Sequence, residues 1–281
     1  MDKYQFLKEE ERLDYTLQTL NEEILNYIEK RKEIANYILD YRKNFIEEHK
    51  DDEDALMEYF DHERYVKEES YKQIDKKLME LTKLKETPYF GKVIFSDEDD
   101  CQEEIYVGRY GLTKDATFEN VIIDWRAPIA SLFYKGSLGP ATYKTPDGEL
   151  PADILARRQF VIKKGSLQGY FDSEVDVKDE ILQMILSSNS GEKLKDIVMT
   201  IQQEQDDIIR EERMKVVVVN GVAGSGKTTI ALHRVAYLLY NYRQQLGNKV
   251  LVLGPNDIFV DYISEILPTL GESDVTEETF A

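Results

Sequence analysis

The N-terminal third of the chain lacks both helix breakers, because all 15 glycines and all 7 prolines lie after residue 87. The single cysteine, Cys101, excludes a disulfide framework and a cysteine-based metal site, and it is compatible with a reducing compartment. No apolar run approaches the roughly 20 residues that span a bilayer. Residues 1–11 also lack the apolar stretch of a secretory signal. We therefore expect a soluble, cytoplasmic protein with no membrane partner.

Basic residues are in deficit, with 36 lysines and arginines against 55 acids and a net charge of −19. Because the phosphate backbone is itself an anion, so acidic a chain is a poor general ligand for nucleic acid, and any such contact must be local. The apolar fraction of 42% is sufficient for a packed core and argues against global disorder.

Residues 1–87 predict a long helical hairpin. Apolar side chains recur at alternating steps of four and three over residues 13–45, interrupted only by Arg31, and a weaker series follows over residues 57–81. A polar stretch, residues 49–54, separates the two series. This pattern favours an antiparallel coiled-coil arm, although an ordinary bundle helix or a dimeric coil would share it.

Four acids, Asp51, Asp52, Glu53 and Asp54, lie at the expected tip of this arm. The simplest interpretation is a solvated turn. The alternative is that the tip presents carboxylates to a basic channel or to an active site that holds a metal.

Residues 88–175 predict a β-rich module, because short apolar runs alternate with glycine and proline turns. The expected strands are residues 89–95, 104–107, 120–123, 131–134, 141–144 and 159–162. The only tryptophan, Trp125, stands between Asp124 and Arg126, which we interpret as a packed ring beside a structural ion pair.

Residues 176–281 predict helices followed by the start of a P-loop α/β domain. The β-branched run 215–219 is typical of a buried parallel strand. Residues 221–228 then fit G-x-x-x-x-G-K-[ST] between that run and a helix. A second apolar run, residues 250–253, completes a β-α-β unit. The predicted fold class is therefore α+β and multi-domain: a coiled-coil arm (1–87), a β-rich module (88–175) and a truncated RecA-like domain (176–281).

The chemistry of the loop predicts ATP and Mg²⁺ as cofactors. Its glycines let backbone N–H groups converge on phosphates, and the following helix directs its positive end at the same anion. Lys227 is expected to reach the β- and γ-phosphates, and the Thr228 hydroxyl to complete the Mg²⁺ shell, so these two are the predicted catalytic residues. The predicted nucleotide-binding residues of the loop are Gly221, Val222, Ala223, Gly224, Ser225, Gly226, Lys227, Thr228 and Thr229.

The loop and residues 233–238 behind it resemble motif I of superfamily 1 helicases of the UvrD/Rep type. In that group a glutamine sixteen positions before the first loop glycine reads adenine, and Gln205 stands at that distance from Gly221. Its carboxamide could both donate to and accept from the adenine edge. Residues 108–112, 124–134 and 254–264, together with the N-terminal hairpin, resemble the helicase D (HelD) family.

This resemblance implies a bacterial ATPase that binds RNA polymerase. Such a protein inserts its coiled-coil arm into the secondary channel, opens the clamp and releases stalled or post-termination polymerase from nucleic acid. Two positions depart from the UvrD type. Thr229 replaces an arginine that packs on adenine, and Gly254 replaces an aromatic that stacks on single-stranded DNA. Base stacking contributes about 1–3 kcal/mol, so the departure at Gly254 disfavours strand tracking, although Asn256 remains a candidate DNA contact.

Beyond residue 253 no apolar strand is followed by Asp-Glu, and no arginine finger is present. We therefore expect the chain to be the N-terminal portion of a longer motor, inactive as an ATPase by itself, with unpaired strand edges that favour aggregation. Two alternatives remain open. One is a DNA helicase in repair or recombination, and the other is a non-enzymatic protein that binds the polymerase channel.

Overall fold

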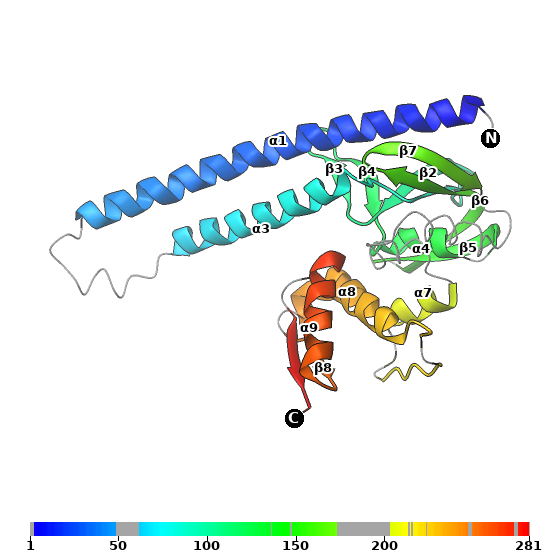
Figure 1. Cartoon of the computed structure of the whole chain (residues 1–281). Helices are drawn as coiled ribbons and strands as arrows, with labels where there is room; N and C mark the ends of the chain where they lie inside the picture. Colours follow the sequence, from blue (N-terminus) through cyan, green and yellow to red (C-terminus); the bar gives the residue numbers. More distant parts are fainter. Residues whose placement is uncertain are drawn as a thin grey trace.

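The computed structural model describes residues 3–48, 62–135, 137–146, 148–172, 203–212, 214, 216–222, 224–246, 249–272 and 275–280. Figure 1 shows a pair of long helices, a sheet at the base of that pair and a group of shorter helices below the sheet. The expected mixture of helix and sheet is therefore confirmed. Within the described ranges, every helix is too short or too polar to cross a membrane. The acidic tip, residues 51–54, lies outside these ranges.

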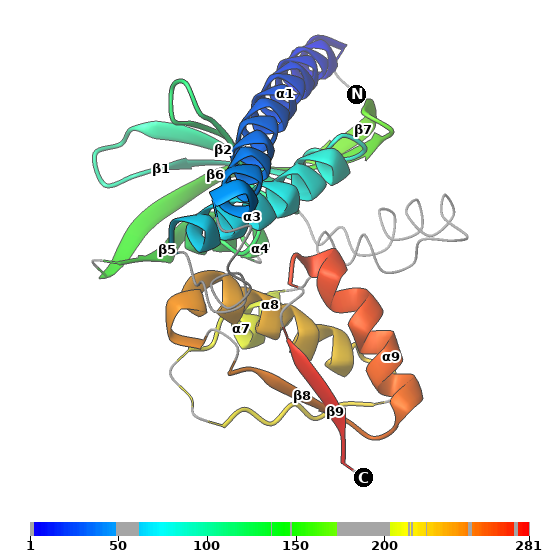
Figure 2. The same cartoon turned by 90° about the vertical axis from the view of Figure 1, so that its left-hand side faces the viewer.

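The predicted helical hairpin consists of two long helices, α1 (Lys3–Glu48) and α3 (His62–Leu84). Ion pairs join Arg31 to Asp75 at 2.7 Å and Arg42 to Glu68 at 3.0 Å. The partner numbers fall on α3 as they rise on α1, so the two helices run antiparallel. Both extend past the edge of the sheet as an arm (Figures 1 and 2).

The first turns of α1 do not belong to the free arm, because they pack on the sheet. Glu9 is 1% exposed, and its carboxylate accepts hydrogen bonds from Lys92 Nζ at 3.2 Å, Arg158 Nη1 at 2.7 Å and the Tyr106 hydroxyl at 3.0 Å. A buried carboxylate needs such partners to offset its lost hydration. The base of the arm is therefore fixed to the sheet by a charged cluster.

Seven strands form this sheet, in the order β3-β4-β2-β1-β6-β5, with β7 also paired to β6. Their bounds are β1 (Gly91–Ser96), β2 (Gln102–Gly108), β3 (Leu112–Lys114), β4 (Glu119–Asp124), β5 (Gly139–Thr145), β6 (Gly148–Lys163) and β7 (Ser166–Asp172). Most neighbours are antiparallel, but β2 and β4 pair in parallel at their last two residues. Because this pair is parallel, the C-terminal ends of β2 and β4 lie side by side, and Trp125 directly follows the end of β4.

The two faces of the sheet bury different partners. One face packs against the base of the arm through a cluster that includes Leu13, Leu20, Leu81, Tyr89 and Phe160. The other face packs against the C-terminal helices through a cluster that includes Val93, Phe95, Trp125, Leu132 and Ile230. The sheet is thus a middle layer between the arm and the segment that carries the phosphate loop.

Two details of the sequence-based strand assignment are wrong. Residues 131–134, predicted as a strand, form the short helix α4 (Ser131–Tyr134) after the 3-10 turn η1 (Pro128–Ala130). Pro128 fixes a helical φ at the start of that turn, and a four-residue apolar run does not by itself distinguish a strand from a helix. The strands β3 and β7 were not predicted at all.

The C-terminal part contains α7 (Gln203–Ile209), α8 (Lys227–Leu246), β8 (Leu251–Gly254), α9 (Asp257–Ile266), η2 (Leu267–Leu270) and β9 (Thr276–Thr279). The expected strand at residues 215–219 is not formed in its described part, residues 216–219, where Val216 and Val218 are 75% and 85% exposed. A strand requires a neighbour for its backbone groups. Instead β8 pairs with β9 in parallel. The start of a RecA-like sheet is therefore not confirmed.

Candidate nucleotide-binding site

The phosphate loop has the backbone shape that its glycines permit. Gly224 and Gly226 both have φ of 83°, a left-handed conformation that side chains with a Cβ rarely adopt. The Ser225 N–H donates to the Val222 carbonyl at 3.3 Å, which closes a turn within the loop, and α8 begins at Lys227. The first N–H groups of α8 have no carbonyl one turn earlier in the helix. They are the groups that would face a phosphate.

The ammonium group of Lys227 is folded onto the loop. Its Nζ donates to the Gly221 carbonyl at 2.9 Å and to the Val222 carbonyl at 2.7 Å. Phosphate oxygens are anionic and make stronger hydrogen bonds than neutral carbonyls. The contacts of Lys227 are therefore of a kind that a nucleotide phosphate would replace.

The close approach within the loop explains why glycine occupies position 221. A Cβ built there would lie 2.7 Å from Ser225 Oγ. Thr228 and Thr229 lie in the first turn of α8 and are partly buried. Ala223 lies outside the described residues. The loop residues are thus brought together as one structure, while their predicted roles remain predictions.

Gln205 lies on α7, which packs against α8. Arg234 of α8 donates from Nη1 to the Ile208 carbonyl at 2.6 Å, and this bond joins the two helices one turn after Gln205. The predicted adenine-reading residue is therefore on an element fixed to the helix of the phosphate loop.

Sequence reasoning missed the junction between α7 and the end of β4. Arg210 donates to the Trp125 carbonyl at 2.7 Å, to the Ala127 carbonyl at 3.1 Å and to Asp206 Oδ1 at 2.7 Å. Burial raises the pKa of Asp206, and the Arg210 guanidinium opposes that rise. The arginine side chain thus binds α7 to the sheet. Only its fixed distance of four residues from an acid could have indicated this.

The ion pair expected beside Trp125 is present and buried. Arg126 donates to Asp124 at 2.9 and 2.7 Å, to Glu272 at 3.0 Å and to the Leu270 carbonyl at 3.1 Å. The acids Asp124 and Glu272 raise the pKa of Arg126 against the opposing effect of burial, which is the largest single influence. Arg243 of α8 also pairs with Glu272. This network fastens η2 and α8 to the sheet.

Trp125 touches α8 directly. Its ring lies edge-on to the His233 ring, with centroids 5.4 Å apart and planes at 60°. Asn241, two turns further along α8, donates from Nδ2 to the Arg126 carbonyl at 3.2 Å. The helix that begins with Lys227 therefore rests on the turn that follows β4.

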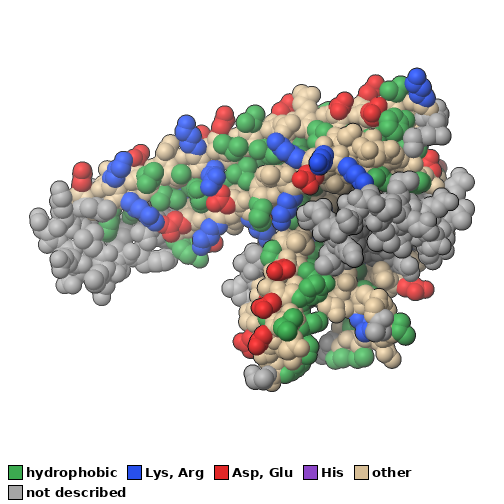
Figure 3. All heavy atoms as spheres, viewed as in Figure 1, with side chains coloured by type: hydrophobic (Ala, Val, Ile, Leu, Met, Phe, Trp, Pro, Cys, Tyr) green, Lys and Arg blue, Asp and Glu red, His purple; other side chains and the backbone are tan. Residues whose placement is uncertain are grey.

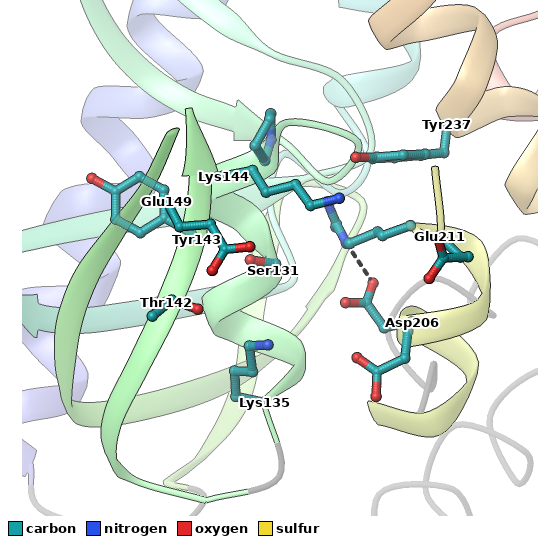
Figure 4. Close-up of a pocket in the computed structure, with 12 residues that line it drawn as sticks. Ser131, Lys135, Thr142, Tyr143, Lys144, Glu149, Asp206, Glu211 and Tyr237 are labelled. Carbon is teal, nitrogen blue, oxygen red and sulfur yellow. Dashed lines mark hydrogen bonds and ion pairs between the residues drawn. The ribbon is translucent and has the colours of Figure 1, made fainter. Parts of the chain in front are cut away.

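A pocket of about 320 Å³ lies where β5 and α4 meet α7 and α8 (Figure 4). Lys144 crosses it to Glu212 at 3.0 Å, and the Tyr237 hydroxyl donates to the same carboxylate at 2.6 Å. Its walls carry both signs of charge, including Lys135 and Asp206. The pocket is thus part of the seam between sheet and loop segment.

The surface around Asn256 is acidic. Asn256 caps α9, with Oδ1 accepting from the Phe259 N–H at 2.9 Å. Asp257, Asp261 and Glu265 are exposed one turn apart on that helix, and acidic side chains gather over it in Figure 3. Such a face repels a phosphate backbone.

The chain is thus a mixed helix-and-sheet protein in which a helical arm and a group of C-terminal helices pack on one sheet. The N-terminal domain of DNA helicase IV HelD matches residues 6–184, well over half of the chain. The chain therefore belongs to the HelD family. The match covers the arm and the sheet, and the phosphate loop lies beyond it. Among curated proteins, no relative matches the chain.

Proposed function

We propose that this chain binds ATP with Mg²⁺ at residues 221–228 and is the ATP-binding, N-terminal portion of a HelD-type motor. The carrying observation is the loop itself, in which two left-handed glycines precede a helix that starts at Lys227. The sequence motif and the backbone conformation of the loop are separate observations, and both support this proposal.

The residues present fit this ligand. The first turn of α8 supplies N–H donors and the positive end of a helix dipole, and Lys227 is already within the loop. Thr228 would hold Mg²⁺ through its hydroxyl, and Gln205 would face the adenine edge. Bound Mg²⁺ neutralises charge on the phosphates.

Calorimetric titration of the full chain with Mg-ATP tests the proposal, with Lys227→Ala as the variant. A hydrogen bond to a charged group contributes about 1.5–3 kcal/mol, so the loss of this lysine should weaken binding by about tenfold or more. Lys249→Ala is the matched control, because it removes an exposed lysine that lies beyond the far end of α8. No binding by the wild type, or equal binding by the Lys227 variant, overturns the proposal.

We further propose that the arm binds RNA polymerase and that the motor releases the polymerase from nucleic acid. Along its length the arm exposes apolar side chains among charges of both signs (Figure 3), with Leu25 63% and Leu39 55% exposed. Large exposed apolar side chains are typical of protein-contacting surfaces. The acidic face of α9 favours a protein partner over DNA.

Deleting residues 1–87 is not a clean test, because the base of α1 packs on the sheet. We suggest capture of the full chain by purified polymerase, comparing wild type with Leu25→Ser/Leu39→Ser. The matched control is Leu150→Ser/Leu155→Ser, which removes similarly exposed leucines from β6. The arm variant should bind more weakly and the control should not. Equal capture of all three contradicts the role of the arm.

The same assay separates the alternatives. A non-enzymatic channel binder would retain polymerase capture and release when Lys227 is replaced by alanine. A repair helicase would separate a forked duplex without polymerase.

A further inference from the structure

Two buried ring nitrogens face the junction between α8 and the sheet without a hydrogen-bond partner among the described residues: Trp125 Nε1 and His233 Nε2. Trp125 is 0% exposed and His233 is 3% exposed. An unsatisfied buried donor or acceptor costs about 1–3 kcal/mol. Two such groups on touching rings therefore call for a functional explanation.

The two groups are chemically complementary. His233 Nδ1 lies 2.7 Å from the Thr229 carbonyl, which can only accept, so Nδ1 carries the proton. Burial lowers the pKa of His233 and keeps the ring neutral, with Arg109 acting in the same direction and the Thr229 contact against it. Nε2 is then an acceptor, and the indole N–H is a donor.

The acceptor ring, His233, is connected to the phosphate loop through Thr229. Thr229 directly follows Thr228, and its carbonyl holds the His233 ring one turn along α8. Phosphates that replace the Lys227 contacts with Gly221 and Val222 would rearrange the loop and the first turn of the helix. His233 would move with that turn.

Trp125, which carries the indole donor, is connected to the arm through backbone contacts. The backbone N–H of Trp125 donates to the Gly108 carbonyl at 3.0 Å. A Cβ at Gly108 would lie 2.4 Å from the Pro88 carbonyl, so the backbone is closely packed here. Three residues on, the Gly111 carbonyl accepts from Lys77 Nζ of α3 at 3.0 Å. A displacement of Trp125 would reach α3 through two contacts.

We propose that Trp125 and His233 form a relay between the phosphate loop and the arm, in which the indole N–H donates to His233 Nε2 when nucleotide is bound. His233 acts as a positioning residue and does not touch the nucleotide. The inference rests on the proposed ATP binding and adds to it a route by which binding reaches the arm.

Because Trp125 is the only tryptophan, its indole N–H gives one cross-peak in a heteronuclear NMR spectrum of the full chain. We expect this proton to shift downfield as Mg-ATP is added, in proportion to the occupancy measured by calorimetry. In His233→Phe, which keeps an aromatic ring but removes both nitrogens, nucleotide should bind and the shift should be lost. In Lys227→Ala binding should weaken by about tenfold or more, and the indole shift should fall with the occupancy.

The outcomes separate the two proposals. No calorimetric binding by the wild type overturns the proposed function. Binding without an indole shift, or an equal shift in His233→Phe, overturns the relay. If His233→Phe does not fold, the wild-type chain still decides the matter, because the nitrogen shift of His233 Nε2 must also move when it becomes an acceptor.

Discussion

Replacing Arg126 with methionine should destabilise the junction between the sheet and the C-terminal helices. Methionine fills much of the space of an arginine side chain but carries no charge and no donors. In the wild type the side chains of Arg126 and Asp124 are both 4% exposed, and that of Glu272 is 2% exposed. The change therefore leaves two carboxylates buried without their shared cation.

Removing one partner of a buried ion pair costs about 3–5 kcal/mol, because the remaining charge stays desolvated. Among the described residues, the Asp124 carboxylate would keep the Arg126 backbone N–H, at 2.8 Å, as its donor, and Glu272 would keep Arg243. We therefore expect a loss of about 3–5 kcal/mol in the free energy of unfolding. In an Asp124→Asn background the same replacement should cost less, because one stranded charge is gone.

Urea unfolding followed by Trp125 emission is the assay, because this ring lies beside the perturbed site. Arg42→Met is the matched control. Its partner Glu68 is also 3.0 Å away, but the two side chains are 58% and 32% exposed, and such pairs contribute at most about 1 kcal/mol. If the Arg126 and Arg42 variants lose the same small amount, burial does not make this ion pair structurally important.

Two further predictions concern the same region. Gly108→Ala should lower the free energy of unfolding by about 1–3 kcal/mol, because the new Cβ would lie 2.4 Å from the Pro88 carbonyl. Gly111→Ala is the control and should lower it less, since its Cβ would meet only ordinary contacts at 3.6 Å. Equal free energies of unfolding for the two variants would contradict this. Burial lowers the pKa of His233 in the folded chain. As the pH falls below about 6.5, the unfolded chain therefore takes up more protons at this residue than the folded chain does. The contribution of His233 to stability is thus present above that pH and is lost as the pH falls. The difference in unfolding free energy between wild type and His233→Phe should therefore shrink from about pH 7 to about pH 5; a constant difference would show that His233 does not titrate differently on folding.

The arm could be predicted from sequence because its signal is local and repeated. The spacing of Leu13 and Leu20 depends only on helix geometry, and both share a buried cluster with Leu81 and Leu84 of α3. The burial of Glu9 could not be predicted, since its partners Lys92 and Arg158 are far along the chain. From sequence alone, an acid near the N-terminus of a helix is predicted to be exposed to solvent, and only the position of the sheet shows that Glu9 is buried.

The glycine turn before α8 could be predicted for the same reason, since its shape depends on residues close together in the sequence. Its binding of a phosphate remains a prediction. The strand before it could not be predicted, because a β-branched run shows only that a strand is possible. Whether Val216 and Val218 join a sheet depends on a neighbour, and the described residues place none there. An apolar run shows that a segment can be buried, whereas a strand also needs a second segment to pair with its backbone groups.

The junction at Trp125 shows that the arm and the C-terminal helices are attached to the same sheet. Sequence reasoning separated them as two domains that share a chain, with a β-rich module between them. In the structure the sheet contacts both: Glu9 holds α1 on one face, and Arg126 and Arg210 hold η2 and α7 on the other. Glu9 and Arg126 make buried ion pairs, and Arg210 donates to a backbone carbonyl. The relay proposed above requires this shared attachment, because a movement of α8 could reach the arm through the sheet.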